Sequence, residues 1–317
     1  MNVAVIGAGA WGTAFARVLL EHGHDVTLAA RDPEQARAIE ETKRNPKYLA
    51  DVELPGIRGA ALGDGPAKGA DLVVIAVPSR AFGEVADALP PNGPVLSLTK
   101  GLDPRTGNRL STLLEDRPVA VLSGPNFAEE IGHGLPAAAV IASEDPELAE
   151  RLQHELNSVI FRVYVNPDVV GLEIAAASKN VIALAAGGVD GLELGDNAKT
   201  AIVTRGLAEM ARLGEACGGR NETFAGLAGM GDLIATSWSH LGRNRHAGEL
   251  IARGATPDEA AAQIGTVEGL TTAPVLRDLS RRVGVEMPIT NSVCDILEGK
   301  SLDDLIAGLM GRRPTAE

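Results

Sequence analysis

The chain has 317 residues, of which 45% are hydrophobic and 22% are charged, and its formal net charge is −13. These values are typical of a soluble globular protein and exclude a disordered or fibrous chain, and the length suffices for two domains. The negative charge argues against a general nucleic-acid binder, because neutralising phosphates requires a basic field; it leaves room for a local basic pocket.

Cysteine, histidine and N-terminal patterns exclude further classes. Cys217 and Cys294 are far apart and form no CxxC pair, so neither a disulfide framework nor a thiolate zinc site is indicated. The six histidines show no metal-binding spacing, and we expect no metal site. No basic leader precedes the strand-like NVAVIGAG, and no apolar run reads as a membrane span. We therefore expect a cytoplasmic protein without stable membrane insertion.

The first half of the chain alternates short apolar runs with helical segments. Runs such as DLVVIAV, bounded by Gly and Pro, are typical of strands buried on both faces of a parallel sheet. Right-handed βαβ units follow from this order. The prediction is a Rossmann-like α/β domain with a mostly parallel sheet over residues 1–165, with strands at 2–7, 25–30, 71–77, 94–99, 118–123, 137–143 and 160–165.

The second half changes pattern after Asn166-Pro167-Asp168, where strand-like runs give way to stretches rich in Ala, Leu and Glu. This predicts an all-helical domain over residues 166–317, with Pro167 or Asp168 beginning a long helix. That helix is apolar nearly all round and should be buried, yet it carries Lys179 near its middle. Either the lysine reaches water along its stem, or its buried amine has a partner or a shifted pKa.

A glycine motif follows the first predicted strand. Gly7, Gly9 and Gly12 fit G-x-G-x-x-G between this strand and an apolar helix. In that context Gly7 permits a tight turn, Gly9 lets a pyrophosphate approach the backbone, and Gly12 lets the helix pack on the strand. The helix N-terminus then faces the anion. The sequence therefore predicts a dinucleotide site, which Trp11 either borders or leaves for packing on the sheet.

The end of the second predicted strand bears on cofactor choice. Asp32 is well placed as a helix N-cap with Pro33 at N1. This leaves Arg31 at the position that distinguishes the ribose 2′-hydroxyl of NAD from the 2′-phosphate of NADP. An arginine there accommodates a 2′-phosphate, so the pattern favours NADP while allowing NAD. A solvated arginine is the alternative.

Eight segments occur in an order that resembles one enzyme family. They are GAGAWGTA, NPKYL, LTKGL, SGPNFAEEI, ASKNVIALAAG, GLAGMGDLIAT, GRNR and VEGLTTA. Over almost the whole chain they resemble NAD(P)-dependent glycerol-3-phosphate dehydrogenase of the bacterial type. The resemblance implies a Rossmann-like domain followed by a helical one. It also implies interconversion of dihydroxyacetone phosphate and sn-glycerol 3-phosphate, a phosphorylated triose pair, with NAD or NADP, supplying glycerophospholipid synthesis.

The resemblance implies catalytic and substrate-binding residues. Lys179 matches the proton-transferring lysine, and a positioned ammonium there would stabilise and protonate an alkoxide. Asp232 matches a residue that contacts substrate beside the lysine, with Thr236 one turn later. Arg243 and Asn244 match the phosphate-gripping pair, although Gly242 stands where the family commonly has serine; a solvated charge pair is the alternative. The implied substrate positions are Lys100, Gly124, Asn126, Lys179, Asp232, Gly242, Arg243 and Asn244.

The cofactor positions implied by the resemblance lie in both halves of the chain. Lys100 follows a predicted strand, at the sheet edge where open α/β proteins bind ligands, and its family counterpart touches both substrate and cofactor. Thr266 and Glu268 match positions at the nicotinamide end, though Glu268 alone would be interpreted as a surface acid. Together the cofactor positions are Gly7, Gly9, Trp11, Gly12, Arg31, Tyr48, Lys100, Ala128, Arg243, Thr266 and Glu268.

Two other functions fit parts of the pattern. A hydroxyacid or imine reductase of the same architecture would keep the glycine loop without needing a phosphate grip. A nucleotide-sensing regulatory protein would bind cofactor without turnover. The apolar helical half also leads us to expect a homodimer.

Overall fold

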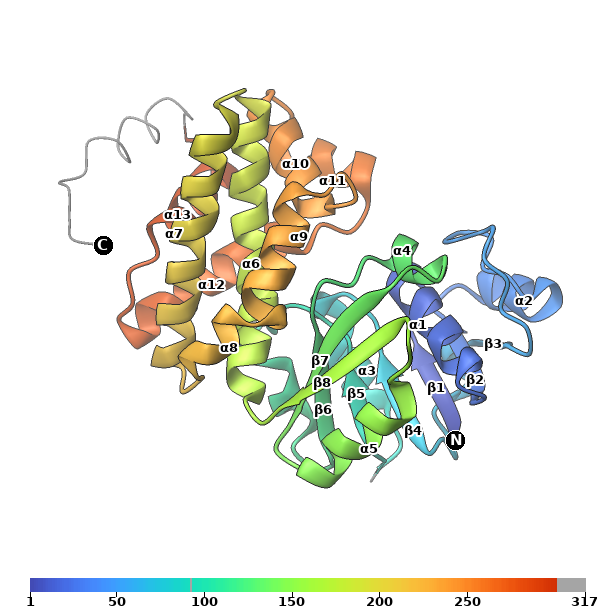
Figure 1. Cartoon of the computed structure of the whole chain (residues 1–317). Coiled ribbons are helices and arrows are strands. Elements are labelled where there is room, and N and C mark those ends of the chain that lie inside the picture. Colours follow the sequence, from blue (N-terminus) through green and yellow to red (C-terminus); the bar gives the residue numbers. More distant parts are fainter. Residues whose placement is uncertain (92, 301–317) are drawn as a thin grey trace.

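The computed structural model describes residues 1–91 and 93–300, in which an eight-stranded sheet is followed by a bundle of helices (Figure 1). The strand order is β3-β2-β1-β4-β5-β6-β7-β8. The strands are β1 (Asn2–Ile6), β2 (Asp25–Ala30), β3 (Arg58–Ala61), β4 (Leu72–Ile75), β5 (Val95–Ser97), β6 (Val119–Ser123), β7 (Ala137–Ser143) and β8 (Phe161–Asn166). All seven predicted strands are present and the mostly parallel sheet is confirmed.

Strand β3 was not predicted. Its four residues, RGAA, contain no β-branched or aromatic side chain, and they pair in parallel with the end of β2 at the sheet edge. Gly59 allows this pairing because a Cβ there would lie 2.2 Å from the Ala36 carbonyl oxygen, on the covering helix α2 (Pro33–Thr42). The edge strand is therefore specified by close packing on a helix rather than by strand propensity.

The remaining helices of the first half connect and cover the strands. They are α1 (Ala10–Glu21), α3 (Ser79–Ala88), α4 (Ala128–Gly132) and α5 (Pro146–Leu156), with short 3₁₀ turns at Leu62–Asp64 and Leu110–Leu114. Asp32 caps α2 by accepting a hydrogen bond from the Glu34 N–H, with Pro33 at N1, as predicted. Separate clusters of buried apolar residues form the core on the sheet.

The last two strands run against the others. β7 is antiparallel to β6, and β8 is parallel to β7, whereas every other neighbouring pair is parallel. Because β8 points toward the amino ends of the parallel strands, helix α6 (Val169–Gly191) begins near that end and rises beside the sheet (Figure 1). Asp168 caps α6 by accepting a hydrogen bond from the Gly171 N–H, which confirms that it begins the predicted long helix.

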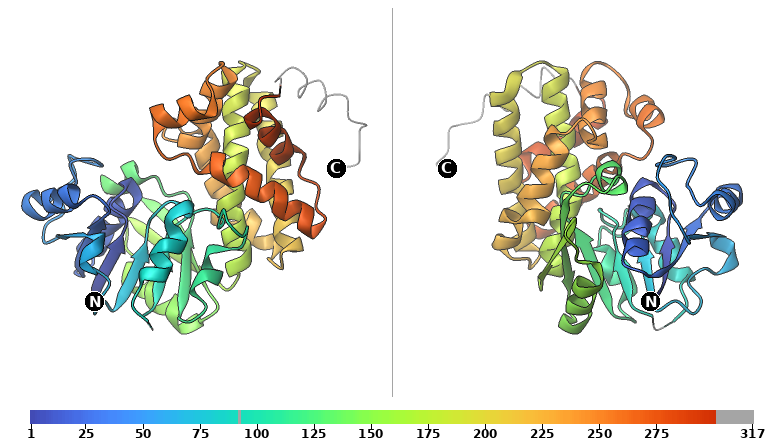
Figure 2. Two further views of the ribbon diagram at one scale, coloured as in Figure 1. Left: turned by 180° about the vertical axis from the view of Figure 1, so that it is seen from behind. Right: turned by 45° about the vertical axis from the view of Figure 1, so that its right-hand side comes forward.

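The second half contains no strand among its described residues, and its helices surround α6 (Figure 2). They are α7 (Gly195–Ala216), α8 (Asn221–Ala225), a π-helical turn (Leu227–Gly231), α9 (Asp232–Trp238), α10 (Arg243–Ala252), α11 (Pro257–Ile264), α12 (Glu268–Val283) and α13 (Pro288–Leu297). The predicted helical character is confirmed over the part described. We propose a domain boundary near residue 165; residues 301–317 of the proposed second domain lie outside the described residues.

Helix α6 corrects one expectation. Its length and apolar composition, with a mean hydropathy of 1.6, would allow it to cross a membrane, contrary to our interpretation of the sequence. However, 89% of the most apolar 18-residue stretch of this helix is buried by the surrounding protein. The helix is apolar because it is the centre of the second core, not because it faces lipid.

Candidate functional site

The glycine loop between β1 and α1 is held by backbone contacts that leave no space for side chains. Gly7 has a φ of 116°, and a Cβ there would lie 2.5 Å from the Ala76 carbonyl oxygen. A Cβ on Gly12 would lie 1.9 Å from the Gly7 carbonyl oxygen. Both positions therefore require glycine for the turn and for the close approach of α1 to β1.

Gly9 differs, because nothing lies within 4 Å of the point where its Cβ would be. The protein itself therefore gives no steric reason for glycine at this position. Gly9 is also the N-cap of α1, and it provides no side-chain cap for the free N–H groups of the first turn. An open cradle at an uncapped helix N-terminus fits the pyrophosphate of a dinucleotide, which would occupy that space and accept those hydrogen bonds.

Two residues that we did not select support this loop. Asn45, fully buried, donates to the Ala8 carbonyl oxygen at 3.0 Å and to Thr13 Oγ1 at 2.7 Å. Gln35 Nε2 donates to the same carbonyl oxygen at 2.8 Å. Asn45 belongs to the NPKYL segment that pointed us to Tyr48; an Asn before a Pro was the available signal.

Four further cofactor positions expected from the sequence lie in the first half, and they differ in exposure. Arg31 is exposed at the end of β2, and the Tyr48 side chain is 38% exposed. Trp11 is partly buried and packs edge-to-face with Phe15, and its buried Nε1 has no hydrogen-bond partner in the structure. Ala128 is buried at the first turn of α4, which packs against α1.

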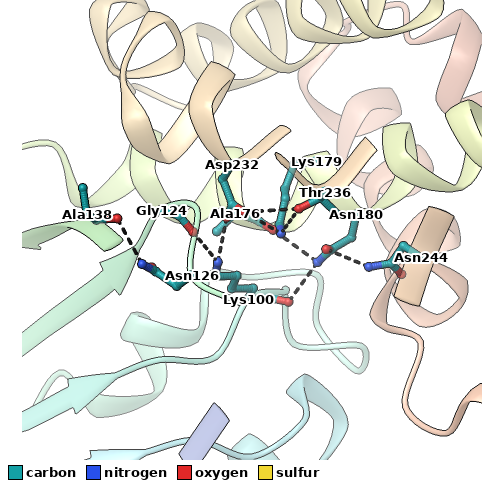
Figure 3. Close-up of polar contacts among 10 residues, drawn as sticks. All are labelled: Lys100, Gly124, Asn126, Ala138, Ala176, Lys179, Asn180, Asp232, Thr236 and Asn244. Carbon is teal, nitrogen blue, oxygen red and sulfur yellow. Dashed lines mark hydrogen bonds and ion pairs between the residues drawn. The ribbon is translucent and has the colours of Figure 1, made fainter. Parts of the chain in front are cut away.

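Lys179 lies at the junction of the two halves (Figure 3). Its residue is 6% exposed, and its ammonium donates to Asp232 Oδ1 at 2.9 Å and to Thr236 Oγ1 at 2.8 Å. Because α9 begins at Asp232, these two residues are one turn apart on the same face of that helix. The alternative that Lys179 reaches water along its stem is therefore wrong, since the amine is paired inside the protein.

Lys100 brings the carboxyl edge of the sheet into this cluster. It follows β5, and its ammonium donates to Asp232 Oδ2 at 2.7 Å and to the Gly124 carbonyl oxygen at 2.9 Å (Figure 3). One carboxylate thus holds two lysines from different halves, and Lys100, Gly124, Lys179 and Asp232 are joined by direct hydrogen bonds.

Burial and neighbouring charges set the protonation of the cluster. Burial lowers the pKa of Lys179 to about 8; the Asp232 carboxylate opposes this shift, while the positive charges of Lys100 and Arg243 add to it. Burial alone would raise the pKa of Asp232, but the two lysine charges hold it below its usual value. At neutral pH the cluster therefore contains an ionised carboxylate and an ammonium that releases its proton more readily than an ordinary lysine.

Asn126 and Gly124 lie on the loop after β6. The Asn126 amide donates to the Ala138 carbonyl oxygen at 3.0 Å, and its buried Oδ1 has no partner in the structure. Gly124 has a φ of 141°, and a Cβ there would lie 2.9 Å from the Ala138 carbonyl oxygen. The Gly-Pro-Asn segment is therefore a turn that requires glycine, and the Gly124 carbonyl oxygen accepts from Lys100.

Arg243 begins α10, and its side chain is exposed. Asn244, buried beside it, donates to Asn180 Oδ1 at 2.9 Å and accepts from the Gly269 N–H at 2.8 Å. Asn180 follows Lys179 on α6 and donates to the Lys100 carbonyl oxygen at 3.4 Å. These amides connect the α10 start to the segment of α6 that carries Lys179. We did not identify Asn180 from the sequence, although it lies in the ASKN motif.

Gly242, at the position where the resemblance led us to expect serine, is tightly packed. A Cβ there would lie 2.4 Å from the Thr236 carbonyl oxygen, and the Gly242 N–H donates to the Ser239 carbonyl oxygen at 3.1 Å. That N–H is therefore already used inside the protein and does not replace a serine hydroxyl donor. What Gly242 supplies is the close approach of the α10 start to Thr236.

Glu268 is not a surface acid, because its carboxylate bridges the halves. Ser79 Oγ donates to Glu268 Oε2 at 2.7 Å, and the Ser79 N–H donates to Oε1 at 3.3 Å. Burial raises the pKa of Glu268. Thr266 lies two residues earlier and is partly exposed. Ser79, at the start of α3, was another residue that the sequence did not point to, since a serine after Pro78 is also an ordinary helix start.

The family models described as NAD-dependent glycerol-3-phosphate dehydrogenase N-terminus and C-terminus match residues 2–149 and 168–307. Glycerol-3-phosphate dehydrogenases [NAD(P)+] from Moorella thermoacetica and Chlorobium limicola are 47% and 44% identical, over the whole chain and 97% and 99% of their own lengths. The crystal structure of glycerol-3-phosphate dehydrogenase from Coxiella burnetii superimposes with a TM-score of 0.93 at 35% identity, covering 98% of this chain and 99% of that one. The chain therefore belongs to the NAD-dependent glycerol-3-phosphate dehydrogenase family.

Proposed function

We propose that this protein interconverts dihydroxyacetone phosphate and sn-glycerol 3-phosphate with NAD(H) or NADP(H). The observation that carries the proposal is the buried Lys179 ammonium, held by Asp232 and Thr236 beside Lys100. This cluster lies at the carboxyl edge of a sheet whose first loop forms a dinucleotide cradle, the usual ligand position in open α/β folds.

Lys179 serves as the acid in carbonyl reduction. Its ammonium has three protons, of which two are donated to Asp232 Oδ1 and Thr236 Oγ1, so one remains for the substrate oxygen. Reduction builds negative charge on that oxygen, and a positioned ammonium in a water-poor site stabilises it and then transfers a proton to it. In the reverse reaction the neutral amine takes the alcohol proton, which its lowered pKa favours.

Asp232 and Lys100 align the reacting end of the substrate. The Asp232 carboxylate fixes both ammonium groups, so that two donors from different halves of the chain converge on one place. We assign the substrate hydroxyl to Asp232 and Lys100, with Gly124 and Asn126 shaping the loop that holds Lys100. Convergence of charged groups from both halves orients a carbonyl between them and lowers the entropic part of the barrier.

The start of α10 supplies the grip on the phosphate. The exposed Arg243 guanidinium matches phosphate oxygens, and the first N–H groups of α10 have no side-chain cap. Asn244 keeps one amide proton for the ligand after donating the other to Asn180. Gly242 contributes by allowing this start to lie close to Thr236.

The cofactor residues are distributed from the glycine loop to α12. We assign the pyrophosphate to Gly7, Gly9 and Gly12, with Trp11 and Ala128 beside it. Arg31 and Tyr48 take the adenosine end, and Lys100, Arg243, Thr266 and Glu268 border the nicotinamide end. When bound, the reduced nicotinamide supplies hydride to the carbonyl carbon. Arg31 favours the 2′-phosphate of NADP.

A steady-state assay tests the function. Purified protein is given dihydroxyacetone phosphate with NADH or NADPH, and a panel of unphosphorylated 2-oxoacids and imines in parallel. We expect turnover of the phosphorylated triose, and a smaller NADPH preference in Arg31→Ala than in wild type. Turnover of an oxoacid or imine with none of the triose phosphate would support another reductase instead. Cofactor binding without turnover of any substrate would support a nucleotide sensor.

Three further expectations belong to the same proposal. We propose a homodimer, supported by the exposed apolar residues Met230, Ile234 and Trp238 along one side of α9 and its preceding turn. Light scattering after size exclusion at several concentrations measures it; a monomer throughout would contradict it. We also propose a cytoplasmic location and supply of sn-glycerol 3-phosphate to glycerophospholipid synthesis, which fractionation and lipid labelling in a deletion strain test.

A further inference from the structure

A second, partly buried ion cluster lies behind the phosphate grip, and none of its hydrogen bonds goes to Lys179 or Asp232. Arg245, on the first turn of α10, donates through Nη1 to Asp190 Oδ2 at 2.7 Å, on the last turn of α6. Lys199 of α7 donates to the same oxygen at 2.7 Å. The side chains of Lys199 and Arg245 are only 6% and 15% exposed. One carboxylate therefore ties three helices together at the end of α10 that carries Arg243.

Arg245 also fixes the turn between α9 and α10. Its Nε donates to the Ser239 carbonyl oxygen at 3.1 Å, the same oxygen that accepts from the Gly242 N–H. Gly242 in turn lies against the Thr236 carbonyl oxygen. The guanidinium therefore bridges the end of the helix that bears Thr236 and the start of the helix that bears Arg243.

The backbones of α6 and α10 are in direct contact at this level. A Cβ on Gly187 would lie 1.8 Å from the Arg245 carbonyl oxygen, and a Cβ on Gly248 would lie 2.0 Å from the Leu184 carbonyl oxygen. Glycines at these crossing points allow α10 to approach the helix that carries Lys179. The Asp190–Arg245 pair then sets how α10 is rotated and where it begins along α6.

From these contacts we infer that Arg245, through Asp190, is a positioning residue for the phosphate grip of Arg243. The inference rests on the proposed function. In dihydroxyacetone phosphate the phosphate and the reacting carbonyl are joined by one CH₂–O unit, so the distance between the α10 start and Lys179 must match this length. Small errors in that distance weaken both binding and alignment of the phosphorylated substrate.

The experiment compares phosphorylated and unphosphorylated triose. For Arg245→Met we expect the KM for dihydroxyacetone phosphate to rise about tenfold or more, whereas kcat/KM for dihydroxyacetone and the cofactor dissociation constant stay at wild-type values. Asp190→Asn should change in the same direction by less, because Arg245 keeps its bond to Ser239. Arg245→Lys should recover part of the loss. Glu249→Gln is the matched control, since Glu249 also contacts Arg245, at 3.3 Å, but lies on the same helix.

The possible results separate this inference from the function on which it rests. Equal losses on both trioses in Arg245→Met and Asp190→Asn would show a general structural role and overturn the inference, as would wild-type constants in two folded variants. If circular dichroism shows that Arg245→Met does not fold, the same comparison of phosphorylated with unphosphorylated triose in Asp190→Asn and Arg245→Lys decides the question. Wild-type protein without activity on dihydroxyacetone phosphate would instead contradict the proposed function.

Discussion

The glycine loop and the Lys179 cluster recognise different parts of the reaction by different means. The loop uses backbone shape, because a Cβ on Gly7 or Gly12 would lie under 3 Å from a backbone carbonyl oxygen, whereas the space beside Gly9 is open. The cluster uses charged side chains from both halves of the chain, with Asp232 holding Lys100 and Lys179. The loop makes its turn within six consecutive residues and is supported by the first half alone, whereas the cluster depends on how the helical half docks on the sheet.

The difference implies that cofactor binding and chemistry respond separately to mutation. A backbone cradle is lost when a Cβ fills it, while the charges of the cluster are untouched. A charged cluster is lost when one amine is removed, while the cradle is untouched.

Removing the Lys179 amine should have the largest effect. In Lys179→Ala we expect kcat to fall by about 10²- to 10⁴-fold, because the acid that protonates the alkoxide is gone. The dissociation constant of the cofactor, measured by fluorescence titration, should change little. Lys68→Ala, which removes an exposed lysine, serves as control. A parallel loss of cofactor affinity would remove the distinction between the two sites.

Loss of the Arg243 guanidinium should affect substrate binding more than chemistry. Hydrogen bonds to charged groups contribute about 1.5–3 kcal/mol, so Arg243→Ala should raise the KM for dihydroxyacetone phosphate by roughly 10- to 150-fold. Thermal stability should be close to that of wild type, because the side chain is exposed. An unchanged KM would place the phosphate elsewhere.

Two alanine substitutions in the glycine loop should distinguish a glycine that fold stability requires from a glycine that cofactor binding requires. Gly12→Ala should destabilise the fold by about 1–3 kcal/mol, because its Cβ would overlap the Gly7 carbonyl oxygen. Gly9→Ala should leave stability unchanged but weaken cofactor binding, since its Cβ enters open space. Denaturant unfolding and cofactor titration measure the two quantities. Tight cofactor binding by a folded Gly9→Ala protein would argue against the cradle.

The pH dependence of the two reaction directions should show whether the Lys179 amine is the group that transfers the proton. Because the pKa of Lys179 is lowered to about 8, reduction, which requires the ammonium, should slow above that pH by up to about tenfold per unit. Oxidation requires the neutral amine, so it should slow below the same pH. Profiles of kcat/KM in both directions test this. Residual activity in Lys179→Ala should lack the inflection, and an inflection that persists would belong to another group.

Local features were predictable from the sequence and long-range ones were not. Glycine spacing, the Asp32 and Asp168 caps and the apolar strands depend on neighbours a few residues away, so their patterns appear directly in the sequence. Strand β3 was missed because its small residues are selected by packing on α2.

The contacts that complete the site join residues far apart in the chain. Asp232 lies 53 residues from Lys179 and 132 from Lys100, and Ser79 lies 189 residues from Glu268. No local pattern encodes such pairs; the family resemblance indicated Lys100, Lys179, Asp232 and Glu268 one by one, and it did not indicate Ser79. The supporting roles of Asn45, Asn180 and Arg245 became visible only through their hydrogen bonds.

Because β7 and β8 run in the reversed direction, the length of the first turns of α6 sets where Lys179 lies relative to the sheet. The chain leaves the sheet toward its amino ends, and Lys179, ten residues after Val169, is carried about 15 Å back along the helix axis to reach Lys100 at the opposite edge. One inserted or deleted residue in that stretch would move the amine by about 1.5 Å and turn it by about 100° away from Asp232. The number of residues between Val169 and Lys179 is therefore as much a part of the site as the lysine itself.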